Sequence, residues 1–502
     1  MLRNIGSNWV LTVVTIATTY VLTPFIIHRL GDEGYGTWTL ITAMTGYLSL
    51  MALGVPMACV RFLAQDVSGR DPEQINRTVG SCAGVYLMIS VVAALLGVVL
   101  ALMFGRFYHI PDPWRPEAPM AFALMSAWVA ASFIALLPEG IMFAHHDFVA
   151  RNAVRITAVL LRCGLTLALL TMRASLVALA IVQILCLAFD FSASVILIRR
   201  RYPAVRLNLR DFEWRTVRRV LSFSVYVLLL SAGARLSFET DALVIGAFIG
   251  VAAIPFYAVA NSLVVYLMDF TIAIAAVVSP MATKLNTEGH ADELRDMFLK
   301  WSKVTLSLSV MSAAFLVVLG PRFIGWWIAP DYERPSGQVL QILMLSCLVF
   351  LPVRGVALPI LMGLGKPRVP TIAFLGAGVA NLVLSIALAR PLGLAGVALG
   401  TALPNVVFAV VVLVVACREL GIAIPNYLAY VVPRAVVGAT PLVAVLLWFR
   451  LGAGVESLVG FATAGSTMLV VFAVTWVFFV YRNDPFVDLR PQLGRLRSWA
   501  RA

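Results

Sequence analysis

The chain has 502 residues, of which 61% are hydrophobic and only 13% are charged. A water-soluble protein of this length needs more charged residues to cover its surface, so this composition excludes a soluble globular protein. The net charge is +13, and many apolar blocks exceed the roughly 18 residues that indicate a membrane span. We therefore expect an all-α polytopic membrane protein.

The apolar blocks predict fourteen membrane spans. Most exceed the roughly 20 residues that cross a bilayer, so tilted or protruding helices are expected. The first block lacks a small-residue cleavage site and continues into similar blocks, so we interpret it as a span rather than a signal peptide. The predicted spans cover residues 7–28, 37–64, 78–105, 118–144, 153–172, 175–198, 220–248, 253–283, 303–327, 337–363, 369–389, 393–417, 427–449 and 457–480.

The basic residues predict the orientation. With the N-terminus in the cytoplasm, we count 25 Lys and Arg on the cytoplasmic side, 8 on the other side and 5 inside spans. The opposite orientation would invert this ratio and violate the positive-inside rule. Both termini are therefore expected in the cytoplasm. The arginine-rich connector at residues 199–219 is better explained by topology and anionic lipids than by nucleic acid.

A short pattern occurs twice, at an offset of 219 residues. It consists of a Gly, four residues, a Gly or Pro, one residue and an aromatic, as in Gly31, Gly36 and Trp38 and again in Gly250, Pro255 and Tyr257. The offset is close to six spans, which indicates two parallel six-helix lobes. We expect an N-lobe at 1–219, a C-lobe at 220–418, and two further helices with a basic tail at 419–502.

Four short motifs lie along the chain: "LGDEGYGTW" (30–38), "LGVPMACVRFLAQ" (53–65), "ETDALVIG" (239–246) and "GLAGVALGTAL" (393–403). With these motifs, the architecture resembles the multidrug/oligosaccharidyl-lipid/polysaccharide exporter superfamily, and within it the polysaccharide-type, Wzx-like flippases of lipid-linked oligosaccharides. The resemblance covers nearly the whole chain. One position departs from the family pattern, because Ala52 and Leu53 stand where an acid often precedes the Gly of the second span. The resemblance implies a central cavity and alternating access.

Several predicted spans contain ionisable residues, which cost roughly 2.5–3.5 kcal/mol each at mid-membrane and usually face a cavity or a partner. Arg61, Arg235 and Arg354 are the candidate substrate-binding residues. A planar guanidinium offers paired donors to phosphate oxygens, which suits the diphosphate of the implied substrate. For Arg61, snorkelling to the membrane surface is the alternative. A self-neutralised pair with Glu239, four residues on, is the alternative for Arg235.

Three acids are candidates for coupling-ion binding or for charge pairing with these arginines: Glu239, Asp241 and Asp269. Pairing and function stay open for Asp269 and for Arg162, whereas Glu139, Asp190 and Arg434 lie nearer the cytoplasmic ends and favour a structural role. Candidate residues for stacking on sugars are Trp38, Tyr226, Tyr257 and Tyr266, although each also suits packing or an interfacial anchor.

Other classes of function find less support in the sequence. The six cysteines lie in or near apolar blocks without a C-x-x-C pair, so we expect neither a metal site nor a disulfide framework. His145 and His146 stand in a short turn with no cysteine nearby. The chain has no P-loop or nucleotide-binding motif, and its connectors are too short for the catalytic loop of a polymerase or ligase. An enzyme, a cofactor and a nucleic-acid partner are therefore not expected.

The leading hypothesis is a flippase in the inner (plasma) membrane. It would move a polyprenyl-diphosphate-linked oligosaccharide, an O-antigen or exopolysaccharide unit, from the cytoplasmic to the outer leaflet. The alternatives are a cation-coupled multidrug exporter, for which an acidic cavity is expected, and a peptidoglycan lipid flippase. The expected partners are the lipid-linked substrate and membrane lipids, with a polysaccharide polymerase or assembly proteins as further candidates.

Overall fold

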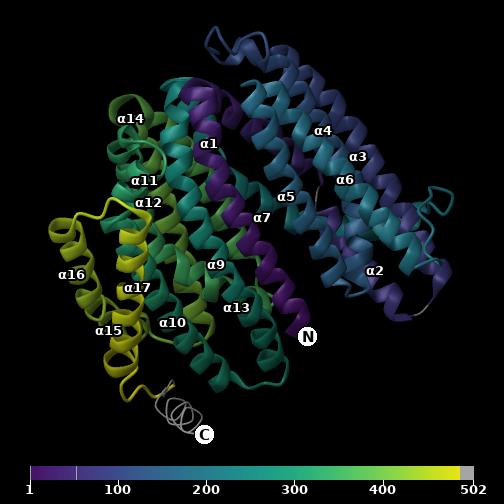
Figure 1. Cartoon of the computed structure of the whole chain (residues 1–502). Coiled ribbons are helices and arrows are strands. Elements are labelled where there is room, and N and C mark those ends of the chain that lie inside the picture. The colour runs from purple at the N-terminus through teal and green to yellow at the C-terminus, as the bar shows by residue number, and fades with distance from the viewer. Residues whose placement is uncertain (1, 53, 70, 487–502) are drawn as a thin grey trace, which may run out of the picture. The chain divides into compact units, whose positions relative to one another are not determined.

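The computed structural model describes residues 2–52, 54–69 and 71–486. Within these ranges every regular element is a helix and no strand occurs, so the predicted all-α fold class is confirmed (Figure 1). The helices form two compact units. Unit 1 comprises residues 1–235 and 242–255, and unit 2 comprises residues 236–241 and 256–502. The predicted lobes divide the chain at residue 219 instead, and their superposition stays a prediction.

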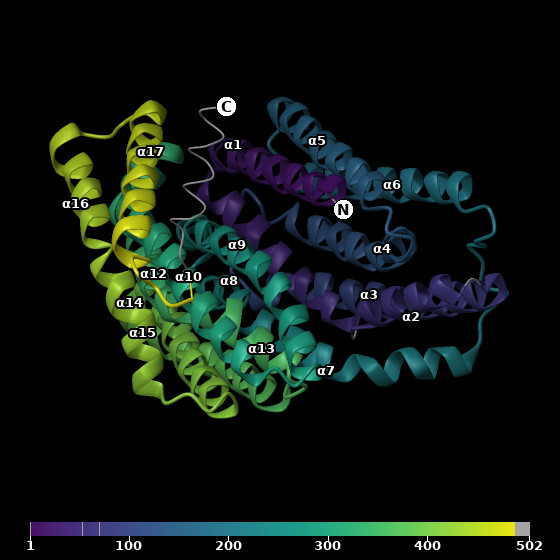
Figure 2. The same ribbon diagram turned by 90° about the horizontal axis from the view of Figure 1, so that it is seen from below.

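Unit 1 is a bundle in which α3, α4 and α6 lie side by side and α5 packs against α1 and α6 (Figure 1). Figure 2 shows α2 and α3 running alongside each other. Asp71 caps the start of α3 by accepting from the backbone N–H groups of Glu73 and Gln74. The elements of this part of the chain are α1 (Leu2–Leu48), η1 (Ser49–Ala52), α2 (Val55–Gly69), α3 (Pro72–Phe107), α4 (Ala118–Ala144), α5 (Phe148–Met172), α6 (Leu176–Arg201), α7 (Trp214–Phe238), α8 (Asp241–Phe248) and η2 (Val251–Ala253).

Unit 2 is built around α12, which packs against both α10 and α14. In the same unit, α16 packs against α17 (Figure 2). Its α14 includes the non-helical residue Gly393, at φ 59°, where the sequence predicts the boundary between two spans. The elements are α9 (Ile254–Thr287), α10 (Ala291–Val318), α11 (Gly320–Trp327), η3 (Pro330–Tyr332), α12 (Glu333–Pro352), η4 (Val353–Ala357), α13 (Leu358–Gly363), α14 (Arg368–Glu419), α15 (Ile424–Val437), α16 (Thr440–Trp448), η5 (Phe449–Ala453), α17 (Leu458–Thr475) and η6 (Trp476–Val480).

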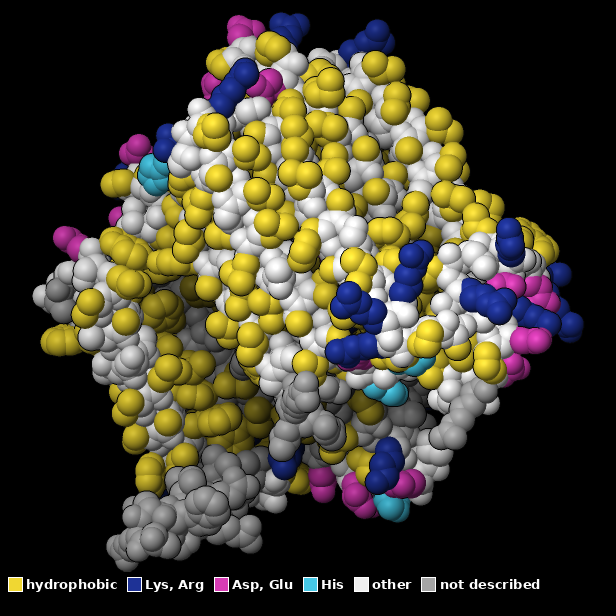
Figure 3. Space-filling model, turned by 45° about the vertical axis from the view of Figure 1, so that its right-hand side comes forward, with side chains coloured by type: hydrophobic (Ala, Val, Ile, Leu, Met, Phe, Trp, Pro, Cys, Tyr) yellow, Lys and Arg dark blue, Asp and Glu magenta, His cyan; other side chains and the backbone are white. Residues whose placement is uncertain are grey.

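The helices are long and apolar enough to cross a membrane. Eleven segments of the described chain meet this condition. Two of them, with 47 and 52 residues, are long enough for two crossings at about 1.5 Å per residue. This is consistent with the fourteen predicted spans. Large apolar side chains such as Leu102, which is 79% exposed, cover much of the helix surface, and Figure 3 shows basic side chains gathered in separate groups on a hydrophobic face.

The second predicted span is interrupted. The sequence predicts one helix over 37–64, but α1 ends at Leu48 and α2 begins only at Val55. Gly54 adopts a positive φ of 71° and precedes Val55 and Pro56. A left-handed residue ends a helix, and proline fits the first turn of a new one. The break therefore follows from the "GVP" sequence.

The first glycine has a positive φ in both copies of the repeated pattern. Gly31 has φ 68° and Gly250 has φ 139°, and glycine adopts such positive values more readily than other residues. The aromatic residue seven positions later is buried in both copies, with Trp38 8% and Tyr257 3% exposed. The resemblance between the two patterns therefore extends to the backbone turn and to the buried aromatic.

A close backbone approach within unit 1 depends on Gly36. A Cβ atom placed there would lie 2.1 Å from the carbonyl oxygen of Val251. This is an overlap with backbone, which a side-chain rotation cannot relieve. Replacing Gly36 by Ala should therefore destabilise the fold by at least about 2 kcal/mol, as overpacking does.

Gly105 is the matched control, because it lies in α3 and an added Cβ would meet nothing within 4 Å. Gly105→Ala should leave the thermal unfolding midpoint in detergent unchanged or raise it, because Ala favours a helix. Equal midpoints for the wild type and Gly36→Ala would show that the approach to Val251 is not needed.

The prediction that the chain has no disulfide is wrong for one pair. Cys59 of α2 and Cys82 of α3 form a disulfide, with their Cα atoms 6.3 Å apart. The two residues are 23 positions apart, and the packing of α2 against α3 brings them together, which the spacing of cysteines alone does not reveal. The remaining cysteines are free: Cys163, Cys186, Cys347 and Cys417.

Candidate functional site

The helix that carries Arg235 is shorter than predicted. The sequence predicts one span over 220–248, but α7 ends at Phe238 and α8 starts at Asp241. The hydroxyl of Thr240 donates to the carbonyl of Leu236 at 2.8 Å, which satisfies one carbonyl at the end of α7. Since Glu239 lies beyond the end of α7, the helical spacing on which its pairing with Arg235 was predicted does not continue to it. The pair stays a prediction.

Asp241 is the centre of a buried hydrogen-bonded cluster in unit 2. Its side chain is enclosed, and the residue is only 2% exposed. The hydroxyl of Tyr257 on α9 donates to Asp241 Oδ2 at 2.6 Å. The hydroxyl of Thr401 on α14 lies 2.9 Å from Oδ1 and 3.1 Å from Oδ2. Two neutral hydroxyls from two helices therefore face one carboxylate.

A second layer supports this cluster. The side-chain amide of Asn381 donates to the hydroxyl of Thr401 at 2.8 Å and to the carbonyl of Ser237 at 3.2 Å. The carbonyl of Val397 lies 3.4 Å from both Thr401 Oγ1 and Ser385 Oγ. A hydroxyl has only one proton to donate, so Thr401 cannot serve all of its neighbouring oxygens at once. Asp241 therefore faces neutral donors among the described residues, and its carboxylate can take up a proton or a monovalent cation.

Arg354 lies in a distorted part of unit 2. It belongs to the π-helical turn η4, which begins directly after Pro352. Its guanidinium carbon is 5.8 Å from the ring centre of Phe350 and 5.2 Å from that of Phe374. Asp269 on α9 is close enough to act on Arg354 electrostatically.

The Nε atom of Arg354 is buried and has no hydrogen-bond partner among the described residues. A buried donor without a partner costs free energy and is rare in folded proteins. The aromatic rings hold the guanidinium by cation–π contacts, while this donor stays available for an acceptor such as a phosphate oxygen. Arg354 therefore has the features expected of an anion-binding residue.

Arg61 occupies a different place, in α2 of unit 1. It is exposed, and its guanidinium carbon lies 6.0 Å from the ring centre of Phe62. It lines a cavity together with Glu139, Arg151 and Arg155. Sequence reasoning gave Glu139 a structural role and did not single out the two arginines. The sequence does contain a signal for these two arginines. Arg151 and Arg155 stand at positions i and i+4, which places both on one face of a helix.

For two of the aromatic candidates, the packing alternative fits the structure. Trp38 and Tyr257 are buried, and Tyr257 is bonded to Asp241, so their rings pack inside the protein. The side chain of Tyr226 lies outside the described part of the structure. For Tyr266, the prediction stands without a test.

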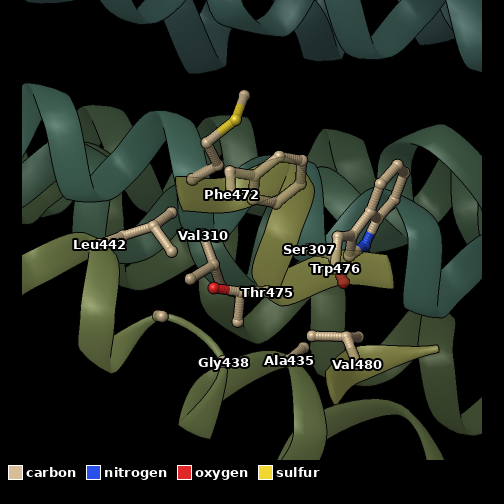
Figure 4. Close-up of a pocket in the computed structure, with 11 residues that line it drawn as sticks. Ser307, Val310, Ala435, Gly438, Leu442, Phe472, Thr475, Trp476 and Val480 are labelled. Atoms are coloured by element: carbon tan, nitrogen blue, oxygen red, sulfur yellow. The ribbon is translucent and has the colours of Figure 1, made fainter. Parts of the chain in front are cut away.

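A small pocket in unit 2 lies between α10, α15, α16 and α17 (Figure 4). Its walls are formed mainly by apolar side chains, among them Leu442 and Phe472, with Ser307 and Thr475 as polar members. The lining residues in the described chain include no ionisable side chain. This pocket therefore lacks the charge that an anionic or coupling-ion site requires.

Comparison with known proteins gives consistent matches. The model of a family described as "Polysaccharide biosynthesis protein" matches residues 1–286. The uncharacterized membrane protein EpsK of Bacillus subtilis is 21% identical over 407 residues, which cover 80% of this chain and 79% of EpsK.

Two solved transporters share the fold. The lipid II flippase MurJ, in an inward closed conformation, is 12% identical with a TM-score of 0.72, covering 95% of this chain and 98% of MurJ. An inward-facing multidrug resistance MATE transporter of the MOP superfamily is 16% identical with a TM-score of 0.68, covering 82% of this chain and 98% of that one. Together with the all-helical structure, these likenesses confirm the predicted fold class.

Proposed function

Because the chain belongs to the polysaccharide biosynthesis protein family, we propose that it is a flippase for a polyprenyl-diphosphate-linked oligosaccharide. In this proposal the lipid-linked unit moves from the cytoplasmic to the outer leaflet of the plasma membrane by alternating access. The tail stays in lipid while the diphosphate and the sugars pass through the protein. The flipping activity named for the structurally similar MurJ supports this reaction type.

The observation that carries the proposal is the environment of Arg354. An arginine within the apolar helices, held between Phe350 and Phe374, keeps a buried donor without a partner among the described residues. A multidrug exporter for cations needs acids at such a position rather than an arginine. We propose that Arg354, Arg235 and Arg61 contact the diphosphate during transport.

Coupling to an ion is assigned to Asp241 in this proposal, with Asp269 as the charge partner of Arg354. The hydroxyls around Asp241 come from α9 and α14, so loss or gain of a proton or cation there changes the contacts between two helices. Such a change in contacts is what biases a conformational equilibrium. Glu239 stays a candidate for pairing with Arg235.

Cells that lack the protein test the function directly. They should accumulate the lipid-linked oligosaccharide in the cytoplasmic leaflet and export less polysaccharide. Wild-type protein should restore export. A deletion strain with normal export and no accumulated intermediate, but with raised sensitivity to cationic drugs, would contradict the proposal and favour a multidrug exporter.

Both termini are proposed to lie in the cytoplasm. The test uses a variant in which the free cysteines are replaced by serine, with either Asp112→Cys or Arg200→Cys added. An impermeant thiol reagent applied to whole cells should label position 112 and not position 200. The reverse labelling pattern would contradict the proposed topology.

Arg235 is tested together with Glu239. Arg235→Ala should nearly abolish flipping, and Arg235→Lys should reduce it partly, because Lys keeps the charge but loses the planar fork of donors. Part of the Ala effect could come from leaving an acid without its partner. The double variant Arg235→Gln/Glu239→Gln separates the two effects. We expect the double variant to be expressed normally but not to flip the substrate. Flipping at the wild-type rate would show that Arg235 does not bind the substrate.

A further inference from the structure

A cavity of about 640 Å³ lies within unit 1, beside α2, α4 and α5. One part of its wall is charged, with Arg61 from α2, Glu139 from α4 and both Arg151 and Arg155 from α5. The other part is apolar and includes two exposed side chains, Met57 at 62% and Phe143 at 39%. The cavity therefore combines a basic region and an apolar region in one open hollow.

Glu139 holds the two arginines of α5 in place. Arg151 Nε donates to Glu139 Oε1 at 2.9 Å, and the Nη2 atom of Arg151 also bonds this oxygen. Arg155 Nη2 donates to the other oxygen, Oε2, at 3.0 Å. The ring of Phe143 packs against the guanidinium of Arg151, with 5.9 Å between its centre and the guanidinium carbon. The acid and the ring fix both guanidinium groups beside the cavity.

The charge balance of the wall is positive. Three arginines and one glutamate line the cavity, which leaves two positive charges. Asp190 on α6 is near enough to act on this group electrostatically, and it is not a lining residue. Each guanidinium carries five N–H donors, and the bonds to Glu139 use two from Arg151 and one from Arg155. The wall therefore suits a doubly charged anion with several acceptor oxygens.

We propose that this cavity binds the diphosphate of a polyprenyl diphosphate lipid, with Arg61, Arg151 and Arg155 as donors and Glu139 as their positioning residue. The apolar wall at Met57 and Phe143 receives the first part of the lipid tail. This amphipathic lining favours a lipid diphosphate over free diphosphate, because free diphosphate has no apolar part that could contact the apolar wall. The inference rests on the proposed function and adds to it a binding site within unit 1.

Binding can be measured on the full chain in nanodiscs, with a fluorescently labelled polyprenyl diphosphate that carries no sugar. Inorganic diphosphate serves as the soluble competitor. The test variant is Arg151→Gln/Arg155→Gln/Glu139→Gln, in which all three charges are removed together so that neither Glu139 nor an arginine of this group is left without its partner. Arg162→Gln is the matched control, because Arg162 lies on the same helix and does not line the cavity. Thermal unfolding of each variant shows that it is folded.

The triple variant should bind the lipid at least tenfold more weakly than the wild type, while Arg162→Gln binds it normally. Inorganic diphosphate should compete only weakly. Equal lipid binding by the triple variant and the wild type would overturn this site and leave the proposed function standing. Strong binding of inorganic diphosphate without binding of the lipid would overturn the lipid assignment. A wild-type protein that binds neither would count against the proposed function itself.

Discussion

Replacing Asp241 by Asn should reduce ion-coupled transport about 10- to 100-fold while the protein still folds. The carboxylate is the only charged group in the described hydrogen-bonded cluster with Tyr257, Thr401 and Asn381. Asn has nearly the same shape but cannot carry the negative charge that a proton or cation neutralises. A hydrogen bond to a charged group is worth about 1.5–3 kcal/mol, which corresponds to this range of loss.

The measurement is substrate flux in proteoliposomes under an imposed proton or sodium gradient. Asp66→Asn is a matched control, because Asp66 is also a buried carboxylate, bonded by the hydroxyl of Thr78 at 2.6 Å in unit 1. That control should keep the response to the gradient. If Asp241→Asn responds to the gradient like the wild type, the coupling role of Asp241 is refuted.

A second large effect is expected at the end of the described chain. Lys303 of α10 and Asp484 form a salt bridge, and their side chains are 1% and 0% exposed. Tyr430 donates to Asp484 Oδ1 at 2.8 Å, and the Lys303 ammonium lies 4.6 Å from the centre of that ring. This cluster fastens the segment after η6 to α10 and α15.

Lys303→Met should lower the free energy of unfolding by about 3–5 kcal/mol, because it leaves a buried carboxylate without its cation. The double change Lys303→Met/Asp484→Leu should recover most of this loss, since no unpaired charge remains. Chemical denaturation in detergent, followed by tryptophan fluorescence, measures the free energy of unfolding of both variants. A single variant as stable as the wild type would contradict the role of the salt bridge.

The same cluster predicts a dependence on pH. Burial alone would raise the pKa of Asp484, but hydrogen bonds from Lys303, Tyr430 and the backbone of Phe486 hold it below its ordinary value of 3.8. A carboxyl with a lowered pKa contributes stability that is complete above pH 3.8 and lost as the pH falls through its folded value. Stability should therefore fall on acidification below about pH 4, and this fall should be smaller in the double variant.

The sequence was sufficient for the features that depend on local physical chemistry. Apolar length predicted the helices, and the boundaries between the apolar blocks predicted the turns at Gly31 and Gly393. The position of Asp241 inside a predicted apolar span marked it as a candidate. These signals are carried by neighbouring residues, so a single sequence contains them.

Features that depend on which helices pack against each other could not be predicted from the sequence. Thr401 and Asn381 lie more than 100 positions from Asp241, and as ordinary polar residues in a helix they gave no signal of their own. The disulfide between Cys59 and Cys82 and the grouping of Glu139 with Arg151 also depend on how the helices pack. Tertiary contacts determine these pairings.

The most direct test of the account is translocation in a purified system. The protein is reconstituted into vesicles that contain a polyprenyl-diphosphate-linked oligosaccharide with a fluorescent sugar, and an impermeant quencher reports the leaflet that holds it. We expect the labelled headgroup to cross the bilayer much faster in vesicles with the protein than in protein-free vesicles. Headgroup movement at the protein-free rate, together with transport of a cationic dye by the same vesicles, would contradict it.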